Sequence, residues 1–600
     1  MEHRPYLLAE EFDHFLGDPD DPAETFSYAR CDELDEKEEF PTAICARFEE
    51  WGLPGQYVPV EHGGGLRDYE QVLQLARTVA RRDLTCAIAH GKTYLGGVCV
   101  WVAGTAEQGA RLGAAIMAGV PVSLGLTERA HGSDLLAGDV RADAGPPGPD
   151  GHWLVSGEKW LINNATRSAV LSLLARTDPD GGPRGFSVLL VDKRDLGEGA
   201  YRHLPKIRTH GIRGADISGI AFDTARVPRG ALVGAEGAGL EVVLKALQLT
   251  RTLCAALSLG AADHGLRLGL DFAEERQLYG RRLVELPQAR RLLTGAAADV
   301  LLHEAVALVA ARAVQAQTAE LAVTSAVTKY LLPTGTDRVL ADLTELLGAR
   351  AFLKGVHAGG RFQKVVRDHR LVGLFDGNTL VNLNALVNQF RPLARGFRRG
   401  TGDTAGARTA CDLAAPLPAL DPARLSLVAR HGSGLLAALP AHVDATVRQA
   451  RSDPALAPVA AAARRLLDAT TAVHAEMEAY GSGLTDVPSA AFETARRYTL
   501  CWAGAACLGL WTHSADHAGG DPRTGRLWRR GLWLHTALDR LLVRLGEPAA
   551  AGAETYDELL GALRETRTSG RLFSLLPQRL PGTQTATTGA TAAGTGRTAC

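Results

Sequence analysis

The sequence has little that would tie it to a nucleic acid, a membrane or an oxidising compartment. Its 600 residues carry 65 basic and 67 acidic side chains, so no strong net charge attracts nucleic acid or an anionic membrane surface. Only nine of the basic residues are lysine, and aromatic residues make up 6% of the chain. The N-terminal segment carries acids where a signal peptide has a basic and then an apolar stretch, which predicts a cytoplasmic protein.

The nine cysteines never form a C-x-x-C pair, so the sequence contains neither a zinc ribbon nor a thioredoxin-type motif. We therefore expect free, buried thiols and no metal site. The longest apolar runs are Tyr94–Ala106 and Tyr498–Trp511. Both are shorter than the roughly 20 residues that span a bilayer, which predicts buried helices.

Length and patterning predict several domains, since about 150 residues per domain gives about four. Helical periodicity dominates residues 1–118, as in Asp68–Arg82, and short β-branched runs separated by turns fill residues 119–230. Long helices follow over residues 231–395. The expected helices there are Leu240–Tyr279, Leu286–Ala316, Ala319–Leu332 and Thr336–Leu347.

Beyond residue 395 the patterning weakens and then returns. Residues 396–420 are rich in Gly, Thr and Ala without an apolar period, which predicts a linker. Residues 421–578 indicate an additional helical domain, and the low-complexity residues 579–600 predict a disordered tail. The expected fold is α+β: an N-terminal helical domain, a middle β-barrel-like domain, a C-terminal four-helix bundle and the additional helical domain.

The usual dinucleotide-binding device is missing as well. Gly234, Gly237 and Gly239 form G-x-x-G-x-G, which is the wrong order for a strand–GxGxxG–helix unit. The most specific segment is Gly125–Ala137, GLTERAHGSDLLA. It resembles the signature of the acyl-CoA dehydrogenase family, with His131 at a position where that family usually has a small residue.

Other segments that resemble this family occur in the family's order over about residues 40–392. They are WGLPGQYVPVEHGGGLRDYEQ (51–71), GTAEQGARL (104–112), WLVSGEKWLINNAT (153–166), FDTARVP (222–228), LTRTLCAALSLG (249–260), ERQLYGRRL (275–283) and RDHRLVGLFDGNT (367–379). The resemblance implies FAD as cofactor and an acyl-CoA or acyl carrier protein substrate. It also implies electron-transfer flavoprotein or O₂ as electron acceptor, and a homodimer or homotetramer.

The resemblance also implies roles for individual residues. The cofactor positions are Leu124, Leu126, Thr127, Ser133, Leu161, Asn163, Arg276, Tyr279, Glu345, Ala349 and Asn378, with Arg276 and Tyr279 reaching the cofactor of a neighbouring subunit. The substrate positions are Ser133, Gln248, Thr250, Arg251 and Gly377. Arg251 is further expected to support the wall of the active site.

Asp376 matches the family's usual catalytic Glu, the base that removes the α-proton of the thioester while flavin N5 takes the β-hydride. Its side chain is one methylene shorter than Glu, which affects the position of the carboxylate. Some relatives carry the base at the position of Thr250, which has no acidic group. The alternative role for Asp376 is a helix cap before Gly-Asn.

Three departures keep other functions open. Leu161 replaces the Trp that borders the flavin in the family, Asn163 replaces a Thr that contacts flavin N5, and Glu345 replaces a Gln of the pyrophosphate segment. The first two favour a flavin-dependent oxidase or N-oxygenase on the same fold. The third favours a catalytically weak scaffold.

Overall fold

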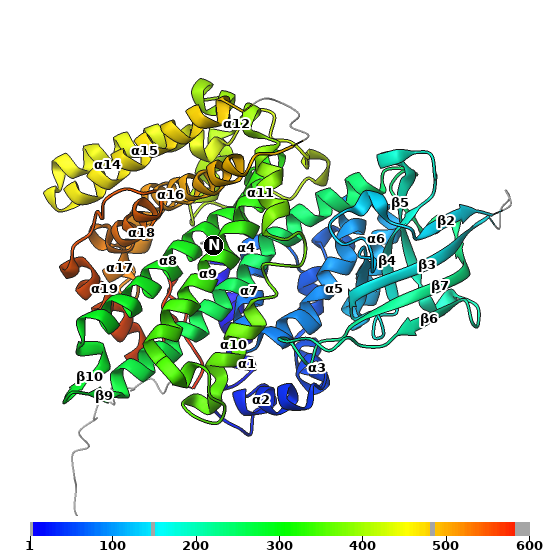
Figure 1. Cartoon of the computed structure of the whole chain (residues 1–600), viewed down its shortest axis with the longest axis horizontal. Coiled ribbons are helices and arrows are strands. Elements are labelled where there is room, and N and C mark those ends of the chain that lie inside the picture. Colours follow the sequence, from blue (N-terminus) through cyan, green and yellow to red (C-terminus); the bar gives the residue numbers. More distant parts are fainter. Residues whose placement is uncertain (1–3, 146–150, 481–485, 583–600) are drawn as a thin grey trace, which may run out of the picture.

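The computed structural model of the protein describes residues 4–145, 151–480 and 486–582. A large mass of helices lies beside a β domain that projects to one side (Figure 1). The first six helices are α1 (Tyr6–Phe15), α2 (Tyr28–Lys37), α3 (Thr42–Trp51), α4 (Tyr69–Arg82), α5 (Leu84–Ala103) and α6 (Ala106–Met117). Side-chain caps fix four of their starts: Ser27 accepts from the N–H of Arg30, Asp68 from that of Gln71, Asp83 from that of Cys86, and Thr105 forms a capping box with Gln108.

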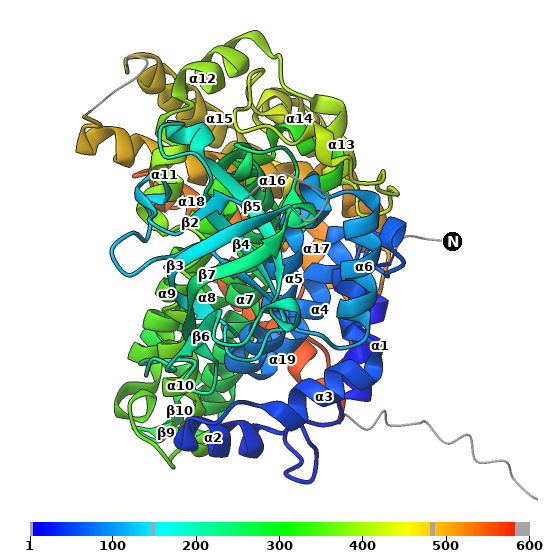
Figure 2. The same cartoon turned by 90° about the vertical axis from the view of Figure 1, so that its right-hand side faces the viewer.

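The middle domain is a mixed sheet in the order β6-β7-β3-β2-β4-β5-β8, with β1 paired in parallel with β4. Its strands are β1 (Val122–Gly125), β2 (Arg141–Ala144), β3 (His152–Asn163), β4 (Val170–Arg176), β5 (Phe186–Asp192), β6 (Tyr201–Leu204), β7 (Ile217–Pro228) and β8 (Leu232–Val233). Alternate residues such as Trp153, Val155 and Ala225 fill a core of its own. Figure 2 shows the sheet in front of α5, which β1 and β4 contact directly.

Three long helices form the bundle: α7 (Gly239–Glu275), α8 (Pro287–Ala316) and α9 (Leu321–Leu347). The strands β9 (Gln277–Leu278) and β10 (Arg281–Arg282) form a hairpin between α7 and α8, and the shorter α10 (Arg361–His369), α11 (Thr379–Val387) and α12 (Phe390–Arg399) complete this part. The two helices expected on either side of Pro333 are one, because burial between α7 and α8 stabilises α9 through the proline.

By length and composition, α7 and α8 could each cross a membrane. However, 83% and 100% of their most apolar windows are buried inside the protein, as in the core helices of a soluble fold. The eight cysteines in the described ranges are free and buried, in agreement with the expectation from sequence.

The segment expected to be a linker, residues 396–420, is partly helical. It contains the end of α12 and all of α13 (Thr404–Cys411), which packs on α8 and buries Ala407, Ala410 and Cys411. The expected linker thus includes a helix, because small residues such as Ala407 and Ala410 allow close packing against α8.

In the described ranges six further helices follow, and α16, α18 and α19 among them pack on α8. They are α14 (Gly434–Ser452), α15 (Ala457–Glu478), α16 (Ser489–Gly519), α17 (Gly525–Trp528), α18 (Leu532–Arg544) and α19 (Ala553–Thr568). They share one continuous apolar core with the N-terminal helices and the bundle. Of the expected tail, residues 583–600 lie outside the described ranges, while Arg579 forms a β-bridge with Arg571.

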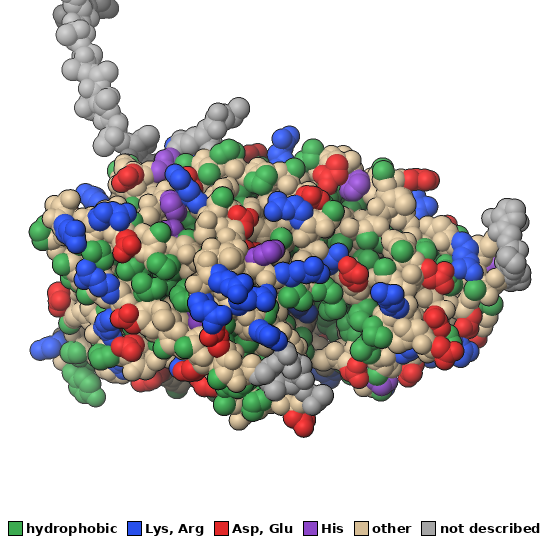
Figure 3. Space-filling view, turned by 90° about the horizontal axis from the view of Figure 1, so that it is seen from above, with side chains coloured by type: hydrophobic (Ala, Val, Ile, Leu, Met, Phe, Trp, Pro, Cys, Tyr) green, Lys and Arg blue, Asp and Glu red, His purple; other side chains and the backbone are tan. Residues whose placement is uncertain are grey.

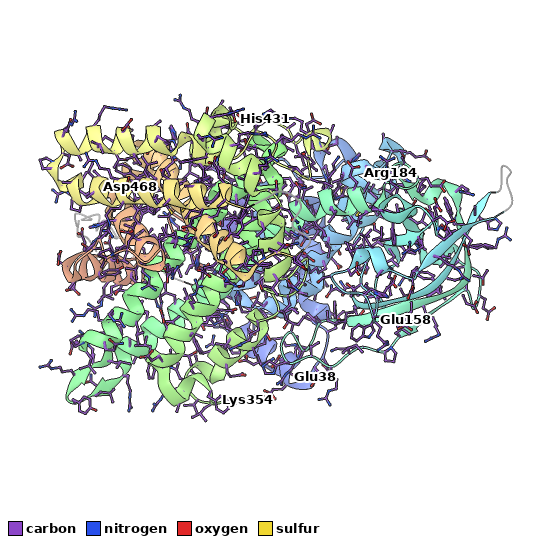
Figure 4. All side chains as sticks on the ribbon, turned by 45° about the horizontal axis from the view of Figure 1, so that its top comes forward. Glu38, Glu158, Arg184, Lys354, His431 and Asp468 are labelled. Carbon is purple, nitrogen blue, oxygen red and sulfur yellow. The ribbon has the colours of Figure 1, made fainter. Side chains whose placement is uncertain are left out.

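The surface matches the balanced composition. Acidic and basic side chains are interspersed over the face seen from above (Figure 3). The labelled side chains of Figure 4 mark the extent of the molecule: Glu158 and Arg184 lie on the β domain, and Asp468 lies on α15 at the helical end.

Candidate active site

Asp376 lies in the turn between α10 and α11 with a backbone that only tertiary contacts can maintain. Its φ angle is 54°, in the left-handed region that a non-glycine residue seldom adopts, and Gly377 follows with φ 92°. Arg251 of α7 donates from Nε to the carbonyl oxygen of Asp376 at 2.7 Å. A Cβ atom at Gly377 would lie 2.8 Å from Nη2 of Arg251, so glycine is required by space as well as by φ.

The carboxylate of Asp376 faces a lysine and a thiol. Lys92 Nζ of α5 lies 3.3 Å from each carboxylate oxygen, and Cys254 Sγ of α7 lies 3.6 Å from Oδ2. The side chains of Lys92 and Asp376 are only 13% and 8% exposed. Burial, with Asp376 beside it, raises the pKa of the Cys254 thiol to about 12, so the thiol is a donor at neutral pH.

The alternative role of Asp376 as a helix cap is not what the structure has. The N-cap of α11 is Asn378, whose side chain accepts from the N–H of Val381 at 2.9 Å. Asn378, expected near the adenine of the cofactor, therefore has a structural role, and the carboxylate of Asp376 is left to the cavity.

Asp376 lines a mostly apolar cavity between α4, α5 and α7. Its lining includes Phe48, Leu53, Val72, Leu75, Val79, Ile88, Leu253, Leu257 and Thr250. On the cavity wall, Tyr57 Oη and His90 Nδ1 are 2.9 Å apart, and burial lowers the pKa of His90 to about 4, which keeps this imidazole neutral. An apolar cavity with a carboxylate in its lining suits an acyl chain whose reacting carbons lie beside that carboxylate.

The turn that follows β1 is held together by Glu128 and Lys159, neither of which the sequence analysis assigned a role. Glu128 accepts from Lys159 Nζ at 2.7 Å and from the N–H groups of Asp139 and Val140. Burial alone would raise the pKa of Glu128, but Lys159 and these two N–H donors hold it below its ordinary value. Lys159 also donates to the carbonyl of Leu126 at 3.0 Å, which fixes the residues expected to meet the flavin.

The end of β3 offers groups that fit a flavin. Asn163 Oδ1 and Trp160 Nε1 are buried without a hydrogen-bond partner in the described ranges. Leu161 sits on a β-bulge with φ 55° and a 40% exposed side chain. The N–H of Trp160 donates to the carbonyl of Thr127, so the bulge lies beside the segment Leu124–Thr127. Unpaired polar atoms and an exposed apolar side chain suit a flat ring with a polar edge.

The residues expected at the pyrophosphate lie elsewhere. Arg276 and Tyr279 belong to the β9–β10 hairpin, where Tyr279 is 93% exposed, and Glu345 and Ala349 are exposed at the end of α9. This hairpin lies at the opposite end of the molecule from the sheet (Figure 1). One chain therefore does not bring these residues together with Asn163 and Thr127.

The expected substrate positions are only partly assembled. Thr250 lines the cavity and Arg251 holds Asp376, whereas Ser133 is exposed on the turn after β1. Gln248 is buried and donates from Nε2 to the carbonyl of Ser426 at 2.9 Å. The segment that follows α13 thus covers a position at which the thioester was expected.

Lys92 is the functional candidate that the sequence analysis missed. The only signal for it was a single lysine inside the otherwise apolar helix α5. A second group of residues without an assigned role consists of Cys31, Asp83 and Cys86. Their ligand atoms lie close enough together to hold a metal ion. Lys364 Nζ, however, donates to Asp83 and to Asp368 there, so a cation already neutralises the carboxylate.

An apolar cavity with a carboxylate in its lining, beside a β domain with groups that fit a flavin, defines a class of flavoprotein oxidoreductases. Family models support this class over most of the helix–sheet–helix unit. The acyl-CoA dehydrogenase N-terminal, middle and C-terminal domain models match residues 21–120, 123–225 and 237–390. The chain belongs to the acyl-CoA dehydrogenase family, whose members are FAD-dependent oxidoreductases, and the expected fold class and cofactor are confirmed.

Curated relatives agree with this family. A probable acyl-CoA dehydrogenase, fadE25, of Mycobacterium bovis is 26% identical over 351 residues, which cover 58% of this chain and 87% of that protein. A cyclohex-1-ene-1-carbonyl-CoA dehydrogenase of Geobacter metallireducens is 26% identical over 366 residues, covering 58% of this chain and 90% of the relative.

Solved structures share the fold. An acyl-CoA dehydrogenase of Bacillus anthracis complexed with FAD has a TM-score of 0.63 at 17% identity and covers 96% of this chain and 93% of its own. The match between this structure and the chain therefore includes the helices that follow α12. The prolyl acyl carrier protein oxidase AnaB has a TM-score of 0.57 at 17% identity and covers 65% of this chain and 99% of its own.

Proposed function

We propose that the protein removes the α- and β-hydrogens of an acyl thioester, with Asp376 as the base. The observation that carries this proposal is that Asp376 lines the mostly apolar cavity, with its backbone fixed by Arg251. The carboxylate is held in one position beside this cavity. It can therefore lie about 3–3.5 Å from the α-carbon of a bound acyl group, which is the distance that proton transfer needs.

Each group of the chain then has a defined task. Asp376 takes the α-proton on a carboxylate oxygen, and Arg251 keeps the Asp376 backbone in its left-handed conformation. The N–H of Asp376 is the donor that we assign to the thioester oxygen, where negative charge develops. The apolar lining excludes water from the reacting carbons. When bound, the flavin supplies the acceptor for the β-hydrogen with its electron pair.

The remaining assignments follow the same proposal. Leu124, Leu126, Thr127, Ser133, Leu161 and Asn163 hold the flavin, with Asn378 near its adenine end. Arg276, Tyr279, Glu345 and Ala349 complete the site at the pyrophosphate from a neighbouring subunit. The distance between the hairpin and the sheet within one chain supports a homodimer or homotetramer. We assign the protein to the cytoplasm, an acyl-CoA or acyl carrier protein as substrate, and electron-transfer flavoprotein or O₂ as acceptor.

A second function on the same fold is a flavin-dependent oxidase or N-oxygenase. It is favoured by Leu161, because an exposed leucine replaces the expected aromatic cover of the flavin. Peroxide formation in air, without an added electron acceptor, would favour this second function.

The test is anaerobic titration of the FAD-loaded protein with acyl thioesters, followed by flavin absorbance. We expect thioesters with an acyl chain of the type that the enzyme accepts to bleach the flavin. The reduction should be about 10²–10⁴-fold slower in Asp376→Asn, since a positioned base contributes about this factor. Cys254→Ser replaces the thiol that contacts the carboxylate with another donor, and serves as the matched control. Bleaching at an unchanged rate in Asp376→Asn would exclude Asp376 as the base.

A further inference from the structure

The cavity that would receive the acyl chain contains a cation. Lys92 Nζ lines this cavity, lies 3.3 Å from both oxygens of Asp376, and stands 3.8 Å from the centre of the Phe375 ring. Ammonium–carboxylate hydrogen bonds are normally about 2.7–2.9 Å, so this pair is loose. An ammonium group has three N–H donors, and in the described ranges only Asp376 accepts from Lys92.

Cations outnumber carboxylates around this point. Arg251 of α7 and Lys329 of α9 face the same turn; Lys329 Nζ donates to the carbonyl of Val372 at 2.6 Å. Among the groups that act most strongly on Arg251 and Lys329 in the described part of the chain, Asp376 is the only carboxylate. Burial lowers the pKa of both cations, which indicates that the protein does not fully compensate their charge.

Proton transfer would make this imbalance worse. When Asp376 takes the α-proton it becomes neutral, and Lys92 loses its only carboxylate in a cavity from which the substrate has displaced water. An uncompensated buried charge costs several kcal/mol. The reaction avoids this cost if the substrate itself carries a negative charge close to Lys92.

We propose that Lys92 forms a carboxylate-binding subsite, and that the substrate is the monothioester of a short dicarboxylic acid. This inference rests on the proposed function, because it places the α-carbon next to Asp376. The α-carbon then lies about 3–3.5 Å from a carboxylate oxygen, which itself lies 3.3 Å from Nζ. A carboxylate about two or three carbons beyond the α-carbon therefore reaches the free N–H of Lys92.

A plain alkyl chain of the same length would fit less well. It would remove water from Lys92 without replacing a hydrogen bond, and a desolvated charge without a new partner weakens binding. The subsite thus selects between two acyl groups of equal length by charge rather than by size.

The experiment measures binding and turnover separately. The FAD-loaded protein is titrated by calorimetry with carboxybutyl-CoA and pentyl-CoA, thioethers that have no acidic α-proton and cannot be dehydrogenated. Glutaryl-CoA and pentanoyl-CoA are then used in anaerobic flavin reduction. Wild type, Lys92→Met, Lys92→Arg and Lys245→Met are compared, where Lys245 pairs with Glu241 near the start of α7, outside the cavity.

We expect wild type to bind carboxybutyl-CoA at least 10-fold more tightly than pentyl-CoA. Lys92→Met should reduce this ratio at least 10-fold, Lys92→Arg should keep most of it, and Lys245→Met should leave it unchanged. Equal binding of the two thioethers by wild type overturns the subsite. An affinity ratio in Lys92→Met equal to that of wild type also overturns it, provided that Lys92→Arg is folded. If neither thioester bleaches the flavin while the binding preference is intact, the proposed function fails and the subsite stands.

Discussion

Two aspartates of this protein face cations in its interior, yet their surroundings differ. Asp299 of α8 is fully buried and accepts from Arg540 at 3.1 and 2.8 Å and from Arg544 at 2.6 Å. Burial alone would raise the pKa of Asp299, but the two arginines lower it to about 2. Asp376 has a looser pair with Lys92, a strained backbone and an adjacent cavity.

The difference separates a structural carboxylate from a reactive one. Both arginines at Asp299 come from α18, so this cluster fastens the additional helices to the bundle with short, geometrically matched bonds. At Asp376 the partners leave one face of the carboxylate open to the cavity. We expect substitutions at Asp299 to change stability and substitutions at Asp376 to change reactivity.

The largest expected effect on stability comes from Asp299→Asn. This substitution removes the carboxylate that two guanidinium groups contact, on side chains that are 25% and 15% exposed. We expect a cost below the about 3–5 kcal/mol of a fully buried pair, because water screens part of each guanidinium. Thermal melting followed by circular dichroism should show a loss of several degrees, with α14–α19 separating from the bundle first. Asp376→Asn is the matched comparison, because Asp376 forms a looser pair, with Lys92 Nζ 3.3 Å from each of its oxygens, and should cost less stability. An equal loss of stability in both variants would contradict the distinction.

Acid should reveal the same difference. The pKa of Asp299 is about 2 in the folded protein and about 3.8 unfolded, so its contribution is complete above pH 4 and is lost as the pH falls towards 2. This lowering of the pKa corresponds to about 2 kcal/mol of the free energy of unfolding. The gap between the melting temperatures of wild type and Asp299→Asn should therefore shrink between pH 4 and pH 2. A constant gap over this range would argue against the depressed pKa.

The smallest effect is expected from Asp376→Glu. The extra methylene moves the carboxylate by about 1 Å from the position that Arg251 sets through the backbone, so flavin reduction should slow by up to about 10²-fold. Stopped-flow reduction at saturating thioester measures this directly, and the melting temperature should stay within a degree or so of wild type. A faster reaction in Asp376→Glu would mean that the carboxylate of wild type is too short for its substrate.

The sequence was a good guide where local pattern decides structure. The period of Asp68–Arg82 predicted α4, and the β-branched runs predicted the core strands of the sheet. The family motifs placed the acyl-CoA dehydrogenase unit, including Asp376 before a glycine that the structure requires. The sequence did not predict the helix within residues 396–420. Small residues that pack closely on α8 leave no apolar period in the sequence.

The chain by itself therefore determined the class of fold, the cofactor and the turn that carries the candidate base, since these depend on short motifs and on residues next to one another. Tertiary structure decided what surrounds that base. Lys92 and Asp376 are 284 positions apart, and Gln248 and Ser426 are 178 apart. No local pattern relates such pairs; they meet only because α5, α7 and the segment after α13 pack against one another. The charge that an acyl group meets in this cavity is a property of that packing.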